Sequence, residues 1–306
     1  MTSTISSISR GIIAVTSCKG GVGKSTVSLE LAFQLVARGR KVGLYDADIY
    51  GPSLPSQLPP EVSKQQIELS EDGYSVQPIM YEGLPLMSFG WFSKLWGSRR
   101  RNATDKSQLK DDDITLRGST IGLLAVQLLH TTRWGDLDYL IVDTPPGTGD
   151  VPQMLAKKVP LRGGVVVTTP CNLAVSDVLK GVRMLERVQV PVLAVVENMA
   201  SFTCGKCSEI HYPFGRGHIE AVLSAISAPS SAPIPGITLP IVSDAACGYQ
   251  GGKDCRLSPN FLQLVDAVEE ACSTDPRPVT LPHELGFNEL PHWPMEMEVH
   301  ALGLIK

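Results

Sequence analysis

The stretch Cys18-Lys-Gly-Gly-Val-Gly-Lys-Ser-Thr26 follows a short apolar segment, residues 11–17, and begins a segment with helical spacing of apolar residues, 24–38, which Gly39 ends. Its last residues match the phosphate-binding loop pattern G-x-x-x-x-G-K-[ST], although Cys18 stands where the first glycine is expected. Glycines let the backbone N–H groups turn toward an anion, and the helix start adds its dipole. We therefore predict a nucleotide site in which Lys24 binds the β- and γ-phosphates and Ser25 ligates Mg²⁺. A glycine-rich turn without a ligand is the alternative.

The apolar segments alternate with helical ones along most of the chain. Segment 176–188 has the pattern of an amphipathic helix, with Ser176 as its expected N-cap. Such alternation predicts an α/β fold with a mostly parallel, doubly wound sheet joined by right-handed β-α-β crossovers. The strands are expected at residues 11–17, 41–45, 139–142, 164–168 and 192–196.

Polar residues stand where several of these strands end. In a parallel sheet ligands bind outside the carboxyl ends of the strands, so Asp46, Asp48, Asp143 and Asn198 should meet at one crevice. Asp143 is predicted to hold Mg²⁺ through water, and Pro145 follows it in a loop that could sense the γ-phosphate. Asp48 is the candidate for orienting or deprotonating the attacking water. Asn198 is the candidate for reading the adenine edge. A loop carboxylate at Asp48 and a turn residue at Asn198 are the alternatives.

The chain has seven cysteines and no secretory signal, which favours free thiols in a reducing compartment over a disulfide framework. Cys204 and Cys207 form a C-x-x-C pair in a segment whose following proline and glycines predict a loop. Such a pair can be a redox couple, half of a zinc site, which His211 could join, or half of an iron–sulfur site. Two chains related by a two-fold axis would supply four thiolates.

The charge and the distribution of apolar residues argue against two classes of protein. The net charge is −4 and charged residues make up 19%, so binding of nucleic acid through bulk charge is not expected. No apolar run reaches the ~20 residues of a membrane span. We expect one domain over residues 1–274, with surface insertions at about 93–113 and 228–235, and a proline-rich irregular tail over 275–306.

Several motifs together resemble the Mrp/Nbp35 family of iron–sulfur cluster carrier ATPases, within the deviant Walker A group of P-loop NTPases (SIMIBI-type). Cys18 and the Tyr-Pro-Phe-Gly-Arg-Gly run at 212–217 are most similar to the plastid branch. One departure is Cys171, where the family usually has Gln. The matching segments are 18–26, 46–53, 87–90, 117–118, 134–150, 167–170 and 196–199.

The resemblance implies a homodimer that hydrolyses ATP slowly and holds a [4Fe-4S] cluster between subunits through Cys204 and Cys207. Transfer to apo-proteins would follow, in an organelle, a plastid rather than a mitochondrion, with the cytoplasm as the alternative. It assigns Lys19 to contact with the partner's phosphates. The predicted catalytic residues are Lys19, Lys24 and Asp48. A nucleotide-switched positioning ATPase and a zinc-stabilised scaffold are the competing functions. The full set of predicted nucleotide-binding residues is Lys19, Gly20, Gly21, Val22, Gly23, Lys24, Ser25, Thr26, Asp46, Asp143, Pro145 and Asn198.

Overall fold

The computed structural model describes residues 8–68, 70–71, 75–91, 118–171, 174–226, 233–241 and 259–273. The predicted insertion at 93–113, the tail at 275–306 and most of the stretch 228–235 lie outside these residues, as do Arg117, Cys247 and Cys255.

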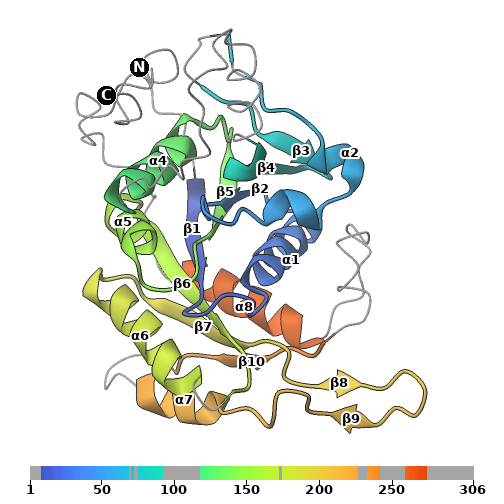
Figure 1. Cartoon of the computed structure of the whole chain (residues 1–306). Helices are drawn as coiled ribbons and strands as arrows, with labels where there is room; N and C mark the ends of the chain where they lie inside the picture. The colour runs from blue at the N-terminus through green and yellow to red at the C-terminus, as the bar shows by residue number, and fades with distance from the viewer. Residues whose placement is uncertain are drawn as a thin grey trace, which may run out of the picture.

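A twisted sheet forms the centre of the described part of the chain (Figure 1). Its eight strands run in the order β10-β7-β6-β1-β5-β2-β4-β3, and every pair is parallel except β3 with β4. The predicted α/β class with a mostly parallel sheet is therefore confirmed. The strands are β1 (Ile8–Thr16), β2 (Val42–Asp46), β3 (Ile79–Tyr81), β4 (Leu84–Ser88), β5 (Leu137–Asp143), β6 (Leu161–Thr168), β7 (Val192–Glu197) and β10 (Gly236–Thr238).

Helices cover both faces of this sheet. Figure 1 shows α1 and α8 on one side and α4, α5, α6 and α7 on the other. Two short turns of helix, η1 (Leu54–Gln57) and α2 (Pro60–Ser63), follow β2. The longer helices are α1 (Lys24–Ala37), α4 (Gly118–Thr131), α5 (Asp150–Lys158), α6 (Ala174–Arg187), α7 (Ile219–Ile226) and α8 (Pro259–Ser273).

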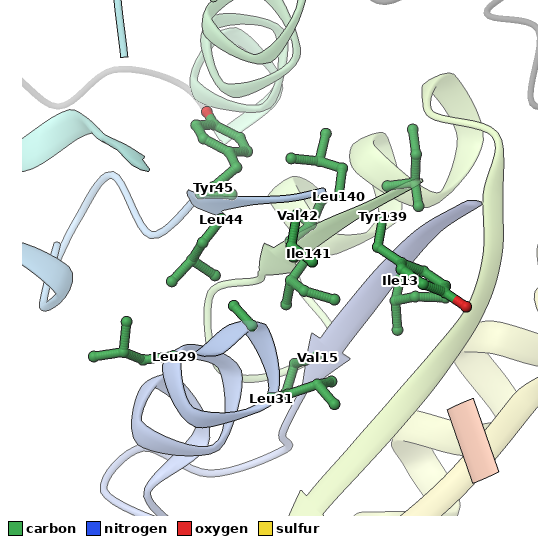
Figure 2. Close-up of a cluster of buried hydrophobic side chains, with 14 of the residues drawn as sticks. Ile13, Val15, Leu29, Leu31, Val42, Leu44, Tyr45, Tyr139, Leu140 and Ile141 are labelled. Atoms are coloured by element: carbon green, nitrogen blue, oxygen red, sulfur yellow. The ribbon is translucent and has the colours of Figure 1, made fainter. Parts of the chain in front are cut away.

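The core lies between the sheet and these helices because the central strands are apolar on both faces. Figure 2 shows Leu29 and Leu31 of α1 beside side chains of β1, β2 and β5. Tyr45 is fully buried, and its hydroxyl donates a hydrogen bond to the carbonyl of Ala125 in α4 at 2.8 Å. The core therefore joins both helical layers to the sheet.

Gly39 ends α1, as predicted. It has a φ of 78°, which a residue with a side chain rarely adopts. The N–H of Gly39 donates to the carbonyl of Val36, and the N–H of Arg40 donates to that of Leu35. These two bonds are the Schellman pattern of helix ends.

One expectation about the helices needs correction: Ser176 is not the N-cap of α6, because the helix begins two residues earlier, at Ala174. Cys204 and Cys207 do lie in a loop, as predicted. The sequence did not predict that β8 (Phe202–Thr203) and β9 (Ile210–His211) pair on either side of this loop as a two-stranded antiparallel hairpin. Strands of two residues are too short to produce a readable alternation of side chains.

Candidate functional site

The glycine-rich loop between β1 and α1 is held by the ends of two other strands. The Asn198 amide, just beyond β7, donates a hydrogen bond from Nδ2 to the carbonyl of Val22 at 2.9 Å. The N–H of Gly147, in the loop after β5, donates to the carbonyl of Ser17 at 2.7 Å. Gly23 has a φ of 83°, and a Cβ there would collide with the Asn198 amide. Glycine is therefore required at this position for two independent reasons.

Lys24 and Asp143 form a buried ion pair at the start of α1. Lys24 Nζ lies 2.5 Å from Asp143 Oδ1, and only 7% and 3% of the two side chains are exposed. The Ser28 hydroxyl donates to the same carboxylate oxygen at 2.9 Å. The other oxygen, Asp143 Oδ2, is buried and has no hydrogen-bond partner among the described residues. A buried carboxylate oxygen without a donor fits a water ligand of Mg²⁺, so these residues suit Mg·ATP.

Asp46 fixes the loop that follows β2. It is fully buried and is the register partner of Asp143 on the neighbouring strand. Burial and the Asp143 charge raise the pKa of Asp46 to about 7. Its carboxylate accepts hydrogen bonds from the backbone N–H groups of Asp48, Ser53 and Leu54 and from the Ser88 hydroxyl, at 2.9–3.1 Å. Direct binding of nucleotide by Asp46 stays a prediction, whereas its role in shaping the loop around Asp48 is visible.

Asp48 and Pro145 line the same pocket, as their predicted roles require. The pocket has a volume of about 480 Å³ and lies between the loops after β2 and β5. The Asp48 carboxylate accepts a hydrogen bond from the Gly51 N–H at 3.1 Å. The other lining residues are Tyr50, Gly51, Pro146, Gly149, Asp150, Val151 and Pro152.

Lys19 contacts its own chain. Its ammonium lies 3.0 Å from Asp177 Oδ2 on α6 and 3.7 Å from the Cys171 sulfur. The hydrogen bond to Asp177 raises the pKa of Lys19. The side chain is 41% exposed, so it can leave this position at little desolvation cost. Asp177 could not be predicted from the sequence, because only the packing of α6 beside the loop brings it to Lys19.

The cysteine pair lies in the turn of the β8–β9 hairpin, which projects away from the main sheet (Figure 1). Cys204 is partly exposed and Cys207 is exposed. The N–H groups of Cys207 and Lys206 donate hydrogen bonds to the Cys204 sulfur, and these bonds lower the pKa of its thiol. The N–H of Ser208, whose φ is 58°, donates to the Cys204 carbonyl and closes the turn. Both thiols are thus accessible, and one is prepared for the thiolate form that metals bind.

Glu197, for which the sequence predicted no role, holds the segment between this hairpin and α7. Its buried carboxylate accepts a hydrogen bond from the N–H of His218 at 2.9 Å. A Cβ at Gly217 would collide with the same carboxylate. Because Glu197 directly precedes Asn198, adjacent residues contact the segment after the hairpin and the phosphate loop. A buried acid at a strand end is the signal that could have found it.

Together, the parallel sheet, the glycine-rich loop after β1 and the Lys24–Asp143 pair define a P-loop NTPase. The family described as ParA, NUBPL iron-transfer P-loop NTPase, matches residues 9–253. The chain belongs to this family. Among the described residues, none of the helices combines the length and apolar character needed to span a membrane.

Relatives from a plastid, a bacterium and an amoeba show comparable identity. The chain is 43% identical over 224 residues to the chloroplastic Fe-S cluster assembly factor HCF101 of Arabidopsis thaliana, covering 73% of this chain and 38% of that protein. It is 44% identical over 211 residues to the iron-sulfur cluster carrier protein of Escherichia coli K12, covering 69% and 52%. Identity to the iron-sulfur cluster transfer protein NUBPL of Dictyostelium discoideum is 38% over 206 residues, covering 67% and 58%. The matches thus span between about two fifths and three fifths of these relatives.

Solved structures agree with the fold. A nucleotide-binding protein from Archaeoglobus fulgidus, in complex with ADP, is 31% identical with a TM-score of 0.63 and covers 84% of this chain and 92% of its own. The cell division ATPase MinD of Pyrococcus furiosus is 18% identical with a TM-score of 0.53, covering 85% and 99%. The second likeness concerns the fold alone.

Proposed function

We propose that this chain binds Mg·ATP at residues 18–26, hydrolyses it slowly, and carries a [4Fe-4S] cluster to apo-proteins. The observation that carries the proposal is the accessible Cys204–Cys207 turn. The segment that follows its hairpin is bonded to Glu197, the neighbour of the residue that contacts the phosphate loop. The names of the relatives, which include an iron-sulfur cluster carrier and a cluster assembly factor, support the same cargo.

The proposed binding of nucleotide rests on the charged side chains and hydrogen-bond donors around the glycine-rich loop. When phosphates enter, the Lys24 ammonium exchanges Asp143 for phosphate oxygens, and Ser25 and Asp143 are the residues that would hold Mg²⁺. When bound, Mg²⁺ neutralises phosphate charge. Asp48 lies in the adjoining pocket, where its carboxylate can orient a water toward the γ-phosphate. A contact of Asn198 with the adenine edge stays a prediction, and its Nδ2 donates a hydrogen bond to the loop carbonyl of Val22.

The cargo part requires two subunits. A [4Fe-4S] cluster takes four thiolates, and the hairpin of one chain supplies Cys204 and Cys207. A homodimer with two-fold symmetry places two hairpins together and completes the set. Lys19 would then leave Asp177 and reach the partner's phosphates, which links dimer formation to ATP. A plastid location stays a prediction, which expression of the full-length protein with a fluorescent tag would test.

The deciding experiment is anaerobic reconstitution with iron and sulfide, read by iron analysis, visible absorption and light scattering. We expect about four irons per two chains, and a dimer whenever the cluster is present. Cys204→Ser should abolish cluster binding and leave ATP binding intact, because the two sites are separate. Cys171→Ser, the matched control outside the hairpin, should keep the cluster. Four irons on a monomer would refute the bridged arrangement.

A further inference from the structure

We propose that the hairpin of a single chain also forms a complete site for one zinc-like divalent cation, with Cys204, Cys207, Glu209 and His211 as its ligands. The site shares its two thiols with the proposed cluster site, but it does not depend on cluster binding. Its ligand set is one tetrahedral site: two sulfurs, one imidazole nitrogen and one carboxylate oxygen.

Strand pairing places these residues on one face of the hairpin. Phe202 pairs with His211 across the two strands, and the N–H of Cys204 donates to the carbonyl of Glu209 at 2.9 Å. Alternate residues of a strand point to the same face, so Glu209 and His211 share a face with Cys204. Ile210, whose side chain is exposed, points to the opposite face. Cys204, Glu209 and His211 therefore share one face of the hairpin with Phe202, and Ile210 lies on the other.

The donor atoms of three of the four residues lie near one another. One donor atom each of Cys207, Glu209 and His211 lie within 4.8 Å of one another. His211 Nε2 and Glu209 Oε2 are 3.9 Å apart. Ligands of tetrahedral zinc, at 2.0–2.3 Å from the ion, stand roughly 3.3–3.8 Å from one another. Binding of one ion requires the exposed side chains of Glu209 and His211, and the partly exposed Cys204, to turn toward it.

The turn itself favours a metal. The N–H groups of Cys207 and Lys206 point at the Cys204 sulfur, and the Cys207 side chain is also hydrogen-bonded to it, so the two thiols adjoin. Backbone N–H donors of this kind compensate the charge of a metal-bound thiolate. The side chains of Glu209 and His211 are 71% and 49% exposed, so neither loses much hydration when it ligates.

Binding of a single ion affects whether the hairpin can also bind the [4Fe-4S] cluster. The ion in one chain uses both thiolates that the bridged cluster needs. A zinc-loaded hairpin is therefore complete as a monomer and closed to a cluster, whereas a metal-free hairpin needs a second subunit. Zinc and cluster should exclude each other.

The first test is an anaerobic titration of the metal-free full chain with Co²⁺, followed by displacement with Zn²⁺. We expect one ion per chain on a monomer, with the visible d–d bands of tetrahedral cobalt and a thiolate charge-transfer band. His211→Ala should weaken Zn²⁺ binding by roughly 100-fold or more, since loss of an outer-shell partner alone costs 10–100-fold. Glu209→Gln should also weaken it. His218→Ala, the matched control beyond the hairpin, should change it by less than about twofold.

The second test separates this site from the cluster. His211→Ala should still take up iron and sulfide, and prior addition of Zn²⁺ should block uptake in the wild type far more than in this variant. His211→Cys should restore the tetrahedral cobalt spectrum with stronger charge transfer, which guards against a folding defect as the cause of the loss. One ion per two chains, or equal Zn²⁺ affinity in His211→Ala and the wild type, would overturn the single-chain site. Loss of cluster uptake in every protein, with Zn²⁺ binding as expected, would instead refute the proposed function alone.

Discussion

Replacing Lys24 with Ala should do two things at once: it breaks the ion pair with Asp143 and removes the ammonium that we propose binds phosphate. The ion pair with Asp143 is almost completely buried and 2.5 Å long. Its loss leaves Asp143 with the Ser28 hydroxyl as its remaining donor among the described residues. Breaking a buried pair by removing one partner costs about 3–5 kcal/mol, since the other charge stays buried and uncompensated. At roughly 2–4 °C per kcal/mol for a chain of this size, Lys24→Ala should melt about 10 °C below the wild type without nucleotide.

ATP should widen that difference. Nucleotide at 100 times its Kd adds about 2.7 kcal/mol to the wild type, whereas Lys24→Ala has lost the countercharge to the phosphates and should gain nothing. The assays are urea unfolding and calorimetric titration with Mg·ATP. Lys64→Ala, an exposed lysine, is the control and should match the wild type in both. Lys24→Met combined with Asp143→Asn should regain most of the stability, because no charge remains buried, without regaining ATP binding.

Wild-type stability in Lys24→Ala would mean that the ion pair contributes nothing in solution. Wild-type ATP affinity in the same protein would remove Lys24 from the phosphate site. Stability and ATP affinity are measured independently, so either expectation can be refuted without the other.

Three further changes probe the surroundings of this pair. Asp48→Asn should bind ATP nearly normally but hydrolyse it at least about tenfold more slowly, because the charge that orients water is gone; unchanged turnover in a phosphate-release assay would make Asp48 a loop carboxylate only. Asp177→Asn should release Lys19 and lower the protein concentration needed for ATP-dependent dimers in light scattering; an unchanged concentration would mean that their contact restrains nothing. The pKa of Asp46 rises to about 7 in the fold, so the native state holds a proton that the unfolded chain releases near pH 4. Its contribution to the free energy of unfolding is therefore complete below about pH 4 and is lost as pH rises to about 7. Asp46→Asn should reduce the dependence of this free energy on pH, measured by urea unfolding at a series of pH values. An identical dependence in the variant would assign the titration to another group.

The core of the fold could be predicted because strands buried on both faces have continuous apolar sequences. The sequences of β1, β5 and β7 contain runs of Ile, Leu and Val. Such runs are typical of parallel strands that are buried on both faces. Strand order was beyond the sequence, since alternation of elements does not say which strands are neighbours. β1 and β2 are joined by one helix, yet β5 lies between them. The N-cap prediction failed at Ser176 because a polar residue near a helix start is common, and only the backbone fixes where the helix begins.

The phosphate loop could be predicted for a different reason: its residues are adjacent in sequence and their chemistry is local. The residues that support it are distant. Ser28 and Asp143 meet across 115 positions, and Asn198 reaches Val22 across 176. Asp177 contacts Lys19 only because α6 packs beside the loop. No spacing in the sequence encodes such contacts, so the loop could be located from its sequence, whereas most of the residues that support it could not.

Glu197 and Asn198 are adjacent in the chain, and each forms a hydrogen bond with a different segment. Asn198 is bonded to the carbonyl of Val22, inside the loop that surrounds the phosphates. Glu197 accepts a hydrogen bond from the N–H of His218, in the segment between the hairpin that carries Cys204 and Cys207 and α7. Its backbone carbonyl also accepts a hydrogen bond from the N–H of Leu239. The phosphate loop and the segment after the hairpin are thus joined through two hydrogen bonds and one peptide bond. Substitution of Asn198 would therefore disturb nucleotide and cysteine sites together, and a loss of ATP affinity there would not by itself identify an adenine contact.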